Sequence, residues 1–325
     1  MNSCKNKCIS FVIPVKDEQD TLNELALSII HEVQNMEGLY APEIIFVDDG
    51  SKDNSWEIMK NLSTTYKDKV FAIKLRKNFG KATALEIGFS RASGEIVFTM
   101  DADLQDDPSE ISRFLAELEQ GFDMVSGWKR RRNDPFSKTI PSLLFNKVTS
   151  FATGIPLHDF NCGFKAYRKE VIEAIKLYGE LHRYIPVLAH DYGFRVSEIE
   201  VKHHPRKHGI SKYGINRYLR GLVDLFTVLA TTRWLRKPGH LFGGVGIVSG
   251  IIGTGILMYL TVLWFIGLGP IGVRPLFFLG ILLCILSVQM ISLGIIAEFF
   301  IKTSSAIETR KFISEETIGN KETKI

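Results

Sequence analysis

Cysteine is scarce in this sequence, and two common nucleotide-binding signatures are missing from it. The 325 residues include four cysteines, Cys4, Cys8, Cys162 and Cys284. Their spacing fits neither a zinc site nor a disulfide scaffold, so we expect thiols kept reduced by the cytosol. No G-x-G-x-x-G follows the first strand-like run and no G-x-x-x-x-G-K-S/T occurs. These absences exclude Rossmann-type dinucleotide binding and P-loop chemistry.

A strong charge of one sign and an N-terminal apolar run are also absent. The net charge is +4, which is too mild to indicate a bulk polyanion as a partner. The first residues, MNSCKNKCIS, contain no apolar core, so we expect no signal peptide. Basic residues do gather at 129–132 and again between Lys202 and Lys237. A solvated surface and contact with lipid headgroups both remain open for these two clusters.

Two long apolar stretches are present near the C-terminus, at about residues 241–268 and 276–301. Each exceeds the roughly 20 residues that span a bilayer, and Glu298 is the one charged residue within them. A short link at 269–275 joins them and basic residues flank the pair, so the positive-inside rule predicts a hairpin with both ends in the cytoplasm. The alternative is a hairpin buried inside a water-soluble protein.

Two further features accompany the apolar hairpin. Residues 218–234 alternate apolar and basic side chains at near-helical spacing, which predicts an amphipathic helix in the plane of the membrane interface. Gly246 and Gly250 form a G-x-x-x-G pair, which permits close contact between helices. We therefore expect a homo-oligomer that forms through the hairpin.

The residues up to about 215 alternate strand-like and helix-like segments. We expect strands at 8–15, 43–47, 70–75 and 95–100, and helices at about 21–35, 54–66 and 81–92. This alternation predicts an α/β fold with a mainly parallel sheet, right-handed crossovers and flanking helices. Ligands of such sheets bind beyond the carboxyl ends of the strands, so the functional site is expected there.

Those carboxyl ends carry many charged residues, with the largest group in the stretch FTMDADLQDDP. Asp101 and Asp103 are two residues apart, so their side chains point the same way from an extended segment. Together with Gln105 they offer oxygens to one Mg²⁺ or Mn²⁺ ion, which would relieve the repulsion between like charges. The alternative is that acids favour a helix N-terminus, and we accept it for Asp107 and partly for Asp106.

Five segments stand in an order that is typical of a known enzyme family: VIPVKDE, VDDGSKD, RKNFGKATAL, DADLQDDP and DFNCGFKAYR. The sequence resembles family-2 glycosyltransferases of the GT-A fold. It is most similar to the polyprenyl-phosphate glycosyltransferases, which include dolichyl-phosphate mannose synthases and bactoprenol glucosyltransferases. The resemblance implies inverting, metal-dependent transfer of a hexose from a nucleotide sugar to undecaprenyl or dolichyl phosphate at the cytoplasmic membrane face. UDP-glucose and GDP-mannose are the donors that we expect first.

The resemblance also implies roles for particular residues. For the nucleotide sugar these are Pro14, Lys16, Glu18, Val47, Asp49, Lys81, Asp101, Ala102 and Asp103. The metal ligands are Asp101, Asp103 and Gln105, and the acceptor phosphate ligands are Lys129, Lys138, Ser142, Arg206 and Ser211. The catalytic residues are Asp103, Asp159 and Lys212. A lipid phosphate is already anionic near neutral pH, so a general base is less needed than for a sugar hydroxyl. Asp159 is expected to orient the acceptor, with a role as base left open; the alternative is a loop aspartate that caps a turn.

The expected organisation is a cytoplasmic catalytic domain at 1–214, interfacial helices at 215–238, a transmembrane hairpin at 239–302 and a polar cytoplasmic tail at 303–325. The histidines lack the spacing of a zinc site. We therefore expect structural or loop roles for His158, His182, His190, His203, His204 and His208.

Two other functions remain as alternatives. A processive polysaccharide synthase usually carries Q-x-x-R-W, but Arg233-Trp234 has no upstream glutamine. A non-catalytic nucleotide-binding scaffold would have lost the metal carboxylates, and both are present.

Overall fold

The structure is a computed structural model that describes residues 7–36, 39–130, 146–177, 179, 181–205, 238–272, 274–304, 316–318 and 321–323. The chain divides into two compact units, Met1–Val228 and Leu229–Ile325. The predicted amphipathic segment at 218–234 lies outside the described residues.

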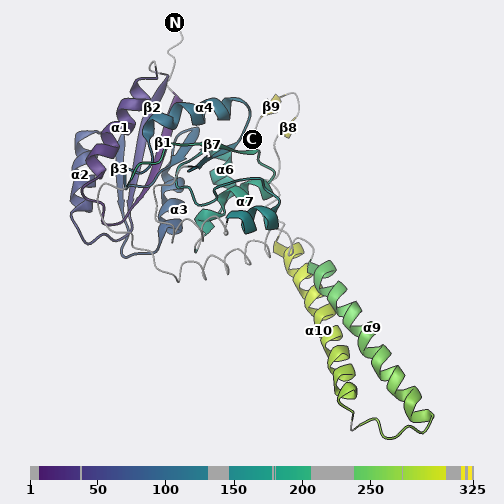
Figure 1. The fold of residues 1–325 in the computed structure, drawn as a ribbon. Helices are drawn as coiled ribbons and strands as arrows, with labels where there is room; N and C mark the ends of the chain where they lie inside the picture. The colour runs from purple at the N-terminus through teal and green to yellow at the C-terminus, as the bar shows by residue number, and fades with distance from the viewer. Residues whose placement is uncertain are drawn as a thin grey trace. The chain divides into compact units, whose positions relative to one another are not determined.

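The first unit is built on a seven-stranded sheet with helices on both faces (Figure 1). Its strands are β1 (Lys7–Val15), β2 (Tyr40–Asp48), β3 (Val70–Lys74), β4 (Ile96–Thr99), β5 (Met124–Trp128), β6 (Lys165–Arg168) and β7 (Val196–Glu200). They are ordered β3-β2-β1-β4-β6-β5-β7. The first four strands are parallel, and β6 runs antiparallel to both β4 and β5. The predicted mainly parallel sheet is therefore confirmed, with one reversed strand that the sequence did not reveal.

The helices follow the strands in the predicted alternation. They are α1 (Leu22–Gln34), α2 (Ser55–Thr65), α3 (Lys81–Arg91), α4 (Ile111–Glu119), α6 (Lys169–Ala174) and α7 (Ile185–Asp191), with short 3-10 turns η1 (Pro108–Glu110) and η2 (Leu181–Arg183). In α1 the buried residues Leu22, Leu25, Ile29 and Val33 recur at helical spacing. That apolar face is the pattern from which the sequence predicted a helix.

Alternate residues of β1 face different layers of the unit, as a strand requires. Phe11 packs in the main core, where its ring is stacked on Phe98 with the centroids 5.2 Å apart. Phe98 also meets Phe114 of α4 edge to face at 5.8 Å. On the opposite face, a Cβ added at Gly88 of α3 would lie 2.2 Å from Val12 Cγ1. Glycine therefore lets the C-terminal half of α3 approach the sheet closely.

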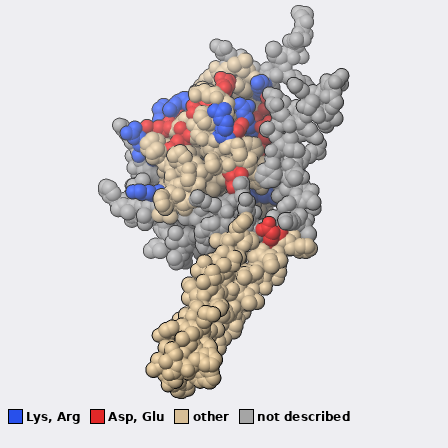
Figure 2. All heavy atoms as spheres, turned by 90° about the vertical axis from the view of Figure 1, so that its right-hand side faces the viewer, with Lys and Arg blue, Asp and Glu red and all other residues tan. Residues whose placement is uncertain are grey.

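The second unit contains the helical hairpin α9 (Pro238–Phe265) and α10 (Pro275–Ser304), together with a small pair of strands, β8 (Glu316–Ile318) and β9 (Lys321–Thr323). Both helices are long and apolar enough to cross a membrane. Only 17% and 11% of their most apolar windows are buried, whereas the core helix of a soluble protein is mostly buried. The face of the hairpin shown in Figure 2 is almost free of charged residues.

Glycines of α9 let this helix pack closely against α10. A Cβ at Gly246 would lie 2.7 Å from a side-chain atom of Ile291, and one at Gly250 would lie 2.6 Å from Ser287 Oγ. The G-x-x-x-G pair therefore packs inside the hairpin, which removes it as support for an oligomer formed through this surface. At one end, the backbone N–H of Gly239 donates to the Glu298 carboxylate at 3.4 Å, which satisfies an amide at the start of α9.

Candidate active site

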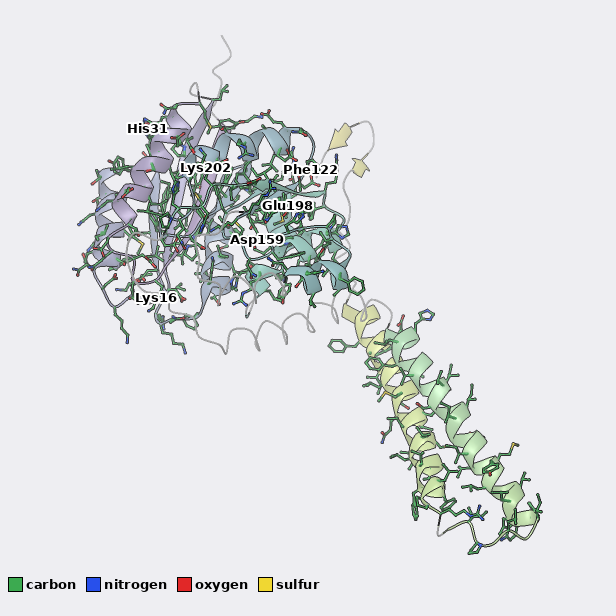
Figure 3. The ribbon with its side chains drawn as sticks, viewed as in Figure 1. Lys16, His31, Phe122, Asp159, Glu198 and Lys202 are labelled. Atoms are coloured by element: carbon green, nitrogen blue, oxygen red, sulfur yellow. The ribbon has the colours of Figure 1, made fainter. Side chains whose placement is uncertain are left out.

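The loops after β1 and β2 are joined by hydrogen bonds between side chains and backbone. The Lys16 ammonium donates to the carbonyl oxygen of Gly50, and the N–H of Glu18 donates to Ser55 Oγ at 2.9 Å. Figure 3 shows Lys16 at the edge of the sheet where β1 ends. Lys16 and Glu18, both predicted to bind the nucleotide sugar, thus lie in a loop that the fold itself holds in place.

Asp49 fastens the loop after β3 to the same edge. Its carboxylate accepts hydrogen bonds from the N–H of Phe79 at 2.7 Å and from that of Gly80 at 3.0 Å. Burial raises the pKa of Asp49, and these two N–H groups oppose the rise because they bind the charged form. Gly50 has a φ of +70°, and a Cβ there would lie 2.8 Å from the backbone nitrogen of Asn78. Asp49 therefore organises the loops of the predicted nucleotide site.

The segment after β4 alternates accessible and buried residues. Asp101, Asp103 and Gln105 are partly exposed, whereas Ala102, Leu104 and Asp106 are buried. The carbonyl oxygen of Ala102 accepts a hydrogen bond from Thr21 Oγ1 at 2.6 Å, and Asp103 Oδ1 accepts one from the N–H of Gln105 at 3.2 Å. The three predicted metal ligands are thus partly accessible on an anchored segment.

Asp101 is paired with Lys81, the first residue of α3. Their side chains are 33% and 23% exposed, so the pair is open to a ligand. Burial opposes ionisation of Asp101, but the positive charges of Lys81 and Lys129 outweigh it and hold the pKa of Asp101 below its usual range. A Cβ at Gly163 would lie 2.5 Å from Asp101 Oδ2. Asp101 is therefore an ionised carboxylate held between Lys81 and the Gly163 backbone.

Asp106, five residues further on, is paired with Lys129 at 2.7 Å in a much drier environment. The Asp106 side chain is 0% exposed and that of Lys129 is 12% exposed. Burial disfavours the charge on Lys129, but the neighbouring Asp106 outweighs this effect and raises the pKa of Lys129. Asp107, rather than Asp106, accepts the capping hydrogen bond from the N–H of Ser109, at 2.9 Å. The cap role accepted in part for Asp106 is therefore replaced by the buried ion pair.

These features agree with a known family. Residues 10–176 match Glycosyl transferase family 2. The chain belongs to this family. Two curated relatives show how far the similarity of this glycosyltransferase extends. It is 36% identical over 312 residues to a dodecaprenyl-phosphate galacturonate synthase from Rhizobium johnstonii, covering 90% of this chain and 92% of the relative. It is 33% identical over 312 residues to an undecaprenyl-phosphate 4-deoxy-4-formamido-L-arabinose transferase from Aeromonas hydrophila, covering 95% and 93%.

A solved structure confirms the GT-A-type fold of the glycosyltransferase. This is the glucosyl-3-phosphoglycerate synthase from Mycobacterium tuberculosis in complex with Mn²⁺, UDP and phosphoglyceric acid. It aligns with a TM-score of 0.52 at 17% identity, covering 70% of this chain and 78% of that chain.

Asp159, the predicted catalytic residue, is buried in a network of polar side chains. It is 1% exposed, and Figure 3 shows it within the sheet unit and away from Lys16. Its Oδ1 accepts hydrogen bonds from the N–H of Asn161 at 3.0 Å and from Asn146 Nδ2 at 3.5 Å. In this glycosyltransferase Asp159 therefore fixes the turn that leads to Gly163.

The remaining predicted residues fall into two groups. Pro14 is partly exposed at the end of β1, whereas the Val47 side chain is fully buried in β2. The others lie outside the described residues, and their roles stay predictions: Lys138, Ser142, Arg206, Ser211 and Lys212.

Several residues of the glycosyltransferase that lie beside Asp101 were not predicted from its sequence. Gly163 contacts the carboxylate directly, and Lys165 at the start of β6 is only 3% exposed. Both lie in the segment DFNCGFKAYR, from which Asp159 alone was assigned a role. The position of Lys165 between the apolar residues Phe164 and Ala166 was the available signal, because lysine is almost never fully buried unless it is paired.

Proposed function

We propose that this glycosyltransferase moves a sugar from a nucleotide sugar to a polyprenyl phosphate, with inversion at the anomeric carbon. The observation that carries the proposal is the accessible, ionised Asp101 beside Lys81, at the carboxyl edge of a family-2 sheet. Both relatives described above are named for a polyprenyl phosphate, one dodecaprenyl and the other undecaprenyl. Their similarity extends over at least 90% of this chain, including the apolar hairpin.

We propose that Asp101, Asp103 and Gln105 hold a Mg²⁺ or Mn²⁺ ion. Their oxygens are the hard donors that these ions prefer, and all three residues are partly exposed. Within the described residues, no group of three or more His, Cys, Asp or Glu side chains is placed to hold a metal unaided. The donor's phosphate oxygens and water would therefore complete the ligand set. When bound, such an ion stabilises the negative charge that develops on the leaving nucleoside diphosphate.

The protein's own residues would contribute in three ways. Lys81 supplies positive charge beside the departing diphosphate, where a fixed cation lowers the energy of the transition state. Lys16 and Glu18 lie in the anchored loop that would receive the nucleoside. A phosphate oxygen of the lipid attacks the anomeric carbon from the face opposite the diphosphate, which inverts the configuration.

Asp159 is proposed to orient this machinery rather than to remove a proton. Its carboxylate is buried and hydrogen-bonded to Asn161 and Asn146, and an anionic phosphate oxygen needs no base. Lys129 remains a proposed acceptor ligand, although its ammonium group is already paired with Asp106.

The proposed acceptor is a membrane lipid, and the hairpin of α9 and α10 is proposed as the anchor. The apolar side chains exposed along both helices favour this placement over a soluble hairpin. We further propose that both ends of the hairpin lie in the cytoplasm, because basic residues flank it on both sides. A homo-oligomer that formed through the hairpin would use a face other than the one holding Gly246 and Gly250.

The identity of the donor sugar is the most specific part of the proposal. The expected donors are UDP-glucose and GDP-mannose, whereas the relatives are named for galacturonate and 4-deoxy-4-formamido-L-arabinose. A test therefore needs a panel that includes neutral hexoses, a hexuronate and an amino sugar. Full-length protein in detergent, polyprenyl phosphate and Mn²⁺ would be mixed with each radiolabelled donor, and labelled lipid would be resolved by thin-layer chromatography. We expect labelled lipid with at least one donor; its absence with every donor would refute the proposed function.

The non-catalytic scaffold is distinguished in the same assay by Asp103→Asn. This variant should lose transfer if the site is catalytic. Under the scaffold alternative, neither the wild type nor the variant would form product. A long polymeric product from the wild type would instead support the polysaccharide synthase.

A further inference from the structure

One polar side chain lies in the middle of α10, the more apolar of the two membrane-length helices. Gln289 is close to the midpoint of this 30-residue helix, about 20 Å from either end at 1.5 Å per residue. The hydrocarbon core of a bilayer is about 30 Å thick. If α10 spans the membrane, the Gln289 amide therefore lies near the centre of the bilayer.

The Gln289 side chain faces away from α9. It is exposed, whereas Ser287 is 8% exposed and packs against Gly250 of α9. Two residues along a helix differ by about 200° in direction, so Gln289 and Ser287 lie on opposite faces of α10. Among the residues that the structure describes, none is hydrogen-bonded to the Gln289 amide. Lipid chains cannot hydrogen-bond to an amide, so this position is unfavourable unless another protein group meets it.

The residues around Gln289 form a regular seam along the outer face of α10. They recur at alternating steps of four and three residues, and this α10 seam consists of Phe278, Leu282, Ile285, Gln289, Ser292 and Ile296. Its four apolar members are 50–64% exposed, and Ser292 is exposed as well. Such a 3.5-residue repeat is the pattern along which two helices pack side by side. A single polar residue within the repeat fixes the partner and the register.

The chemistry of the seam favours a second copy of this chain as its partner. Two copies inserted in the same direction present parallel α10 helices, so a two-fold axis between them brings Gln289 opposite the partner's Gln289. An amide both donates and accepts hydrogen bonds, so two identical amides can satisfy each other. Two copies of a carboxylate or an ammonium group would repel. The seam is therefore complementary to itself.

We propose that the α10 seam is an interface with a second copy of this chain, in which the two Gln289 amides are hydrogen-bonded to each other. The interface lies on the face of α10 opposite the one that packs against Gly250, so it adds to the hairpin contact without replacing it. The inference goes beyond sugar transfer and rests only on the proposed placement of the hairpin in a bilayer.

The test is disulfide crosslinking of the full chain in vesicles of phosphatidylethanolamine and phosphatidylglycerol. The parent carries Cys284→Ser, which removes the thiol of the hairpin, and it measures the background from the other cysteines. Ser292→Cys places a thiol on the seam and keeps Gln289. The matched control is Val288→Cys, because Val288 is 66% exposed but points about 100° to one side of Gln289. Each protein is oxidised with copper phenanthroline and resolved on a non-reducing gel.

We expect a crosslinked dimer from Ser292→Cys and only background from Val288→Cys. Adding Gln289→Leu to the Ser292→Cys chain should reduce the crosslinked fraction about three- to tenfold, as expected for the loss of one hydrogen bond between membrane helices. Leucine is more favourable than glutamine in lipid, so this loss reports weaker pairing rather than unfolding. Val288→Leu in the same chain should leave the crosslinked fraction unchanged.

Three results would overturn the proposal. They are equal crosslinking of Ser292→Cys and Val288→Cys, background crosslinking of both, and crosslinking of Ser292→Cys that Gln289→Leu does not reduce. A crosslinked product with a different protein, formed only in native membranes, would also overturn it, because the seam would then serve another partner. The assay contains no substrate, so its outcome is independent of whether the proposed sugar transfer is found.

Discussion

Two aspartate–lysine pairs lie within one short segment after β4, and they differ in their access to solvent. Asp101 and Lys81 remain about one-third and one-quarter exposed, whereas Asp106 is fully buried with Lys129. A pair that solvent reaches can exchange its partner for a substrate or a metal ion at little cost. A buried pair cannot, because each charge would lose its compensating partner in a dry environment. The comparison favours a chemical role for the first pair and a structural role for the second, in addition to the acceptor contact proposed for Lys129.

The largest effect should follow from breaking the buried pair. Lys129→Met leaves the Asp106 carboxylate buried without its partner, and we expect a loss of about 3–5 kcal/mol in stability. Thermal unfolding of the full chain in detergent measures the change. The double variant Lys129→Met/Asp106→Leu should recover most of the loss, because it removes both charges. If Lys129→Met were as stable as the wild type, the pair would have no structural role.

The open pair should behave in the opposite way. Asp101→Asn is expected to lower transfer about 100-fold or more, because it removes a charge aimed at the metal and the diphosphate. Its stability should stay within about 1 kcal/mol of the wild type, because the pair is partly exposed. Activity and thermal unfolding are measured on one preparation. A large loss of stability with full activity would reverse the assignment of the two pairs.

A smaller effect is expected when Gly163, which packs against the Asp101 carboxylate, is replaced. The Cβ of Gly163→Ala would meet the Asp101 carboxylate at 2.5 Å, so the carboxylate must move. We expect kcat to fall about tenfold, as for a misplaced catalytic group. Gly255→Ala is the matched control, since nothing lies within 4 Å of a Cβ at that position. Equal activity of the two variants would show that Asp101 tolerates displacement.

The smallest effect concerns Asp107, the fourth aspartate of the segment. Asp107 accepts the N–H of Ser109 at 2.9 Å and contacts His204 Nε2 at 3.1 Å. Asp107→Ala should cost about 1 kcal/mol in stability through loss of the cap, with transfer unchanged. A drop in transfer without any loss of stability would bring Asp107 into the functional site.

Much of the first half of the fold was predictable from local pattern. Strands β1 to β4 and helices α1 to α3 lie where alternating apolar runs and helical periodicity placed them, because each element buries one continuous apolar face. Strand β6 was not predicted. It has four residues with a charge at each end, and its antiparallel direction depends on pairing with β4 and β5.

The candidate site was predictable only in part, for the same reason. The two-residue spacing of Asp101, Asp103 and Gln105 is local, and the alternating exposure in the structure agrees with it. The partner of Asp106 is not local, because helix α4 separates Asp106 from Lys129 in the sequence. The residues that surround Lys165 likewise come from α3, β4, β6 and η2, so no single stretch of sequence contains them.

The central claim is metal-dependent sugar transfer to a lipid phosphate, and one measurement tests it most directly. Labelled polyprenyl-phosphate sugar is quantified for the full chain with Mn²⁺, with EDTA, and with EDTA followed by excess Mn²⁺. The account predicts product with Mn²⁺, none with EDTA and recovery on readdition, with Asp103→Asn inactive throughout. Undiminished product in EDTA, or full activity of Asp103→Asn, would contradict it.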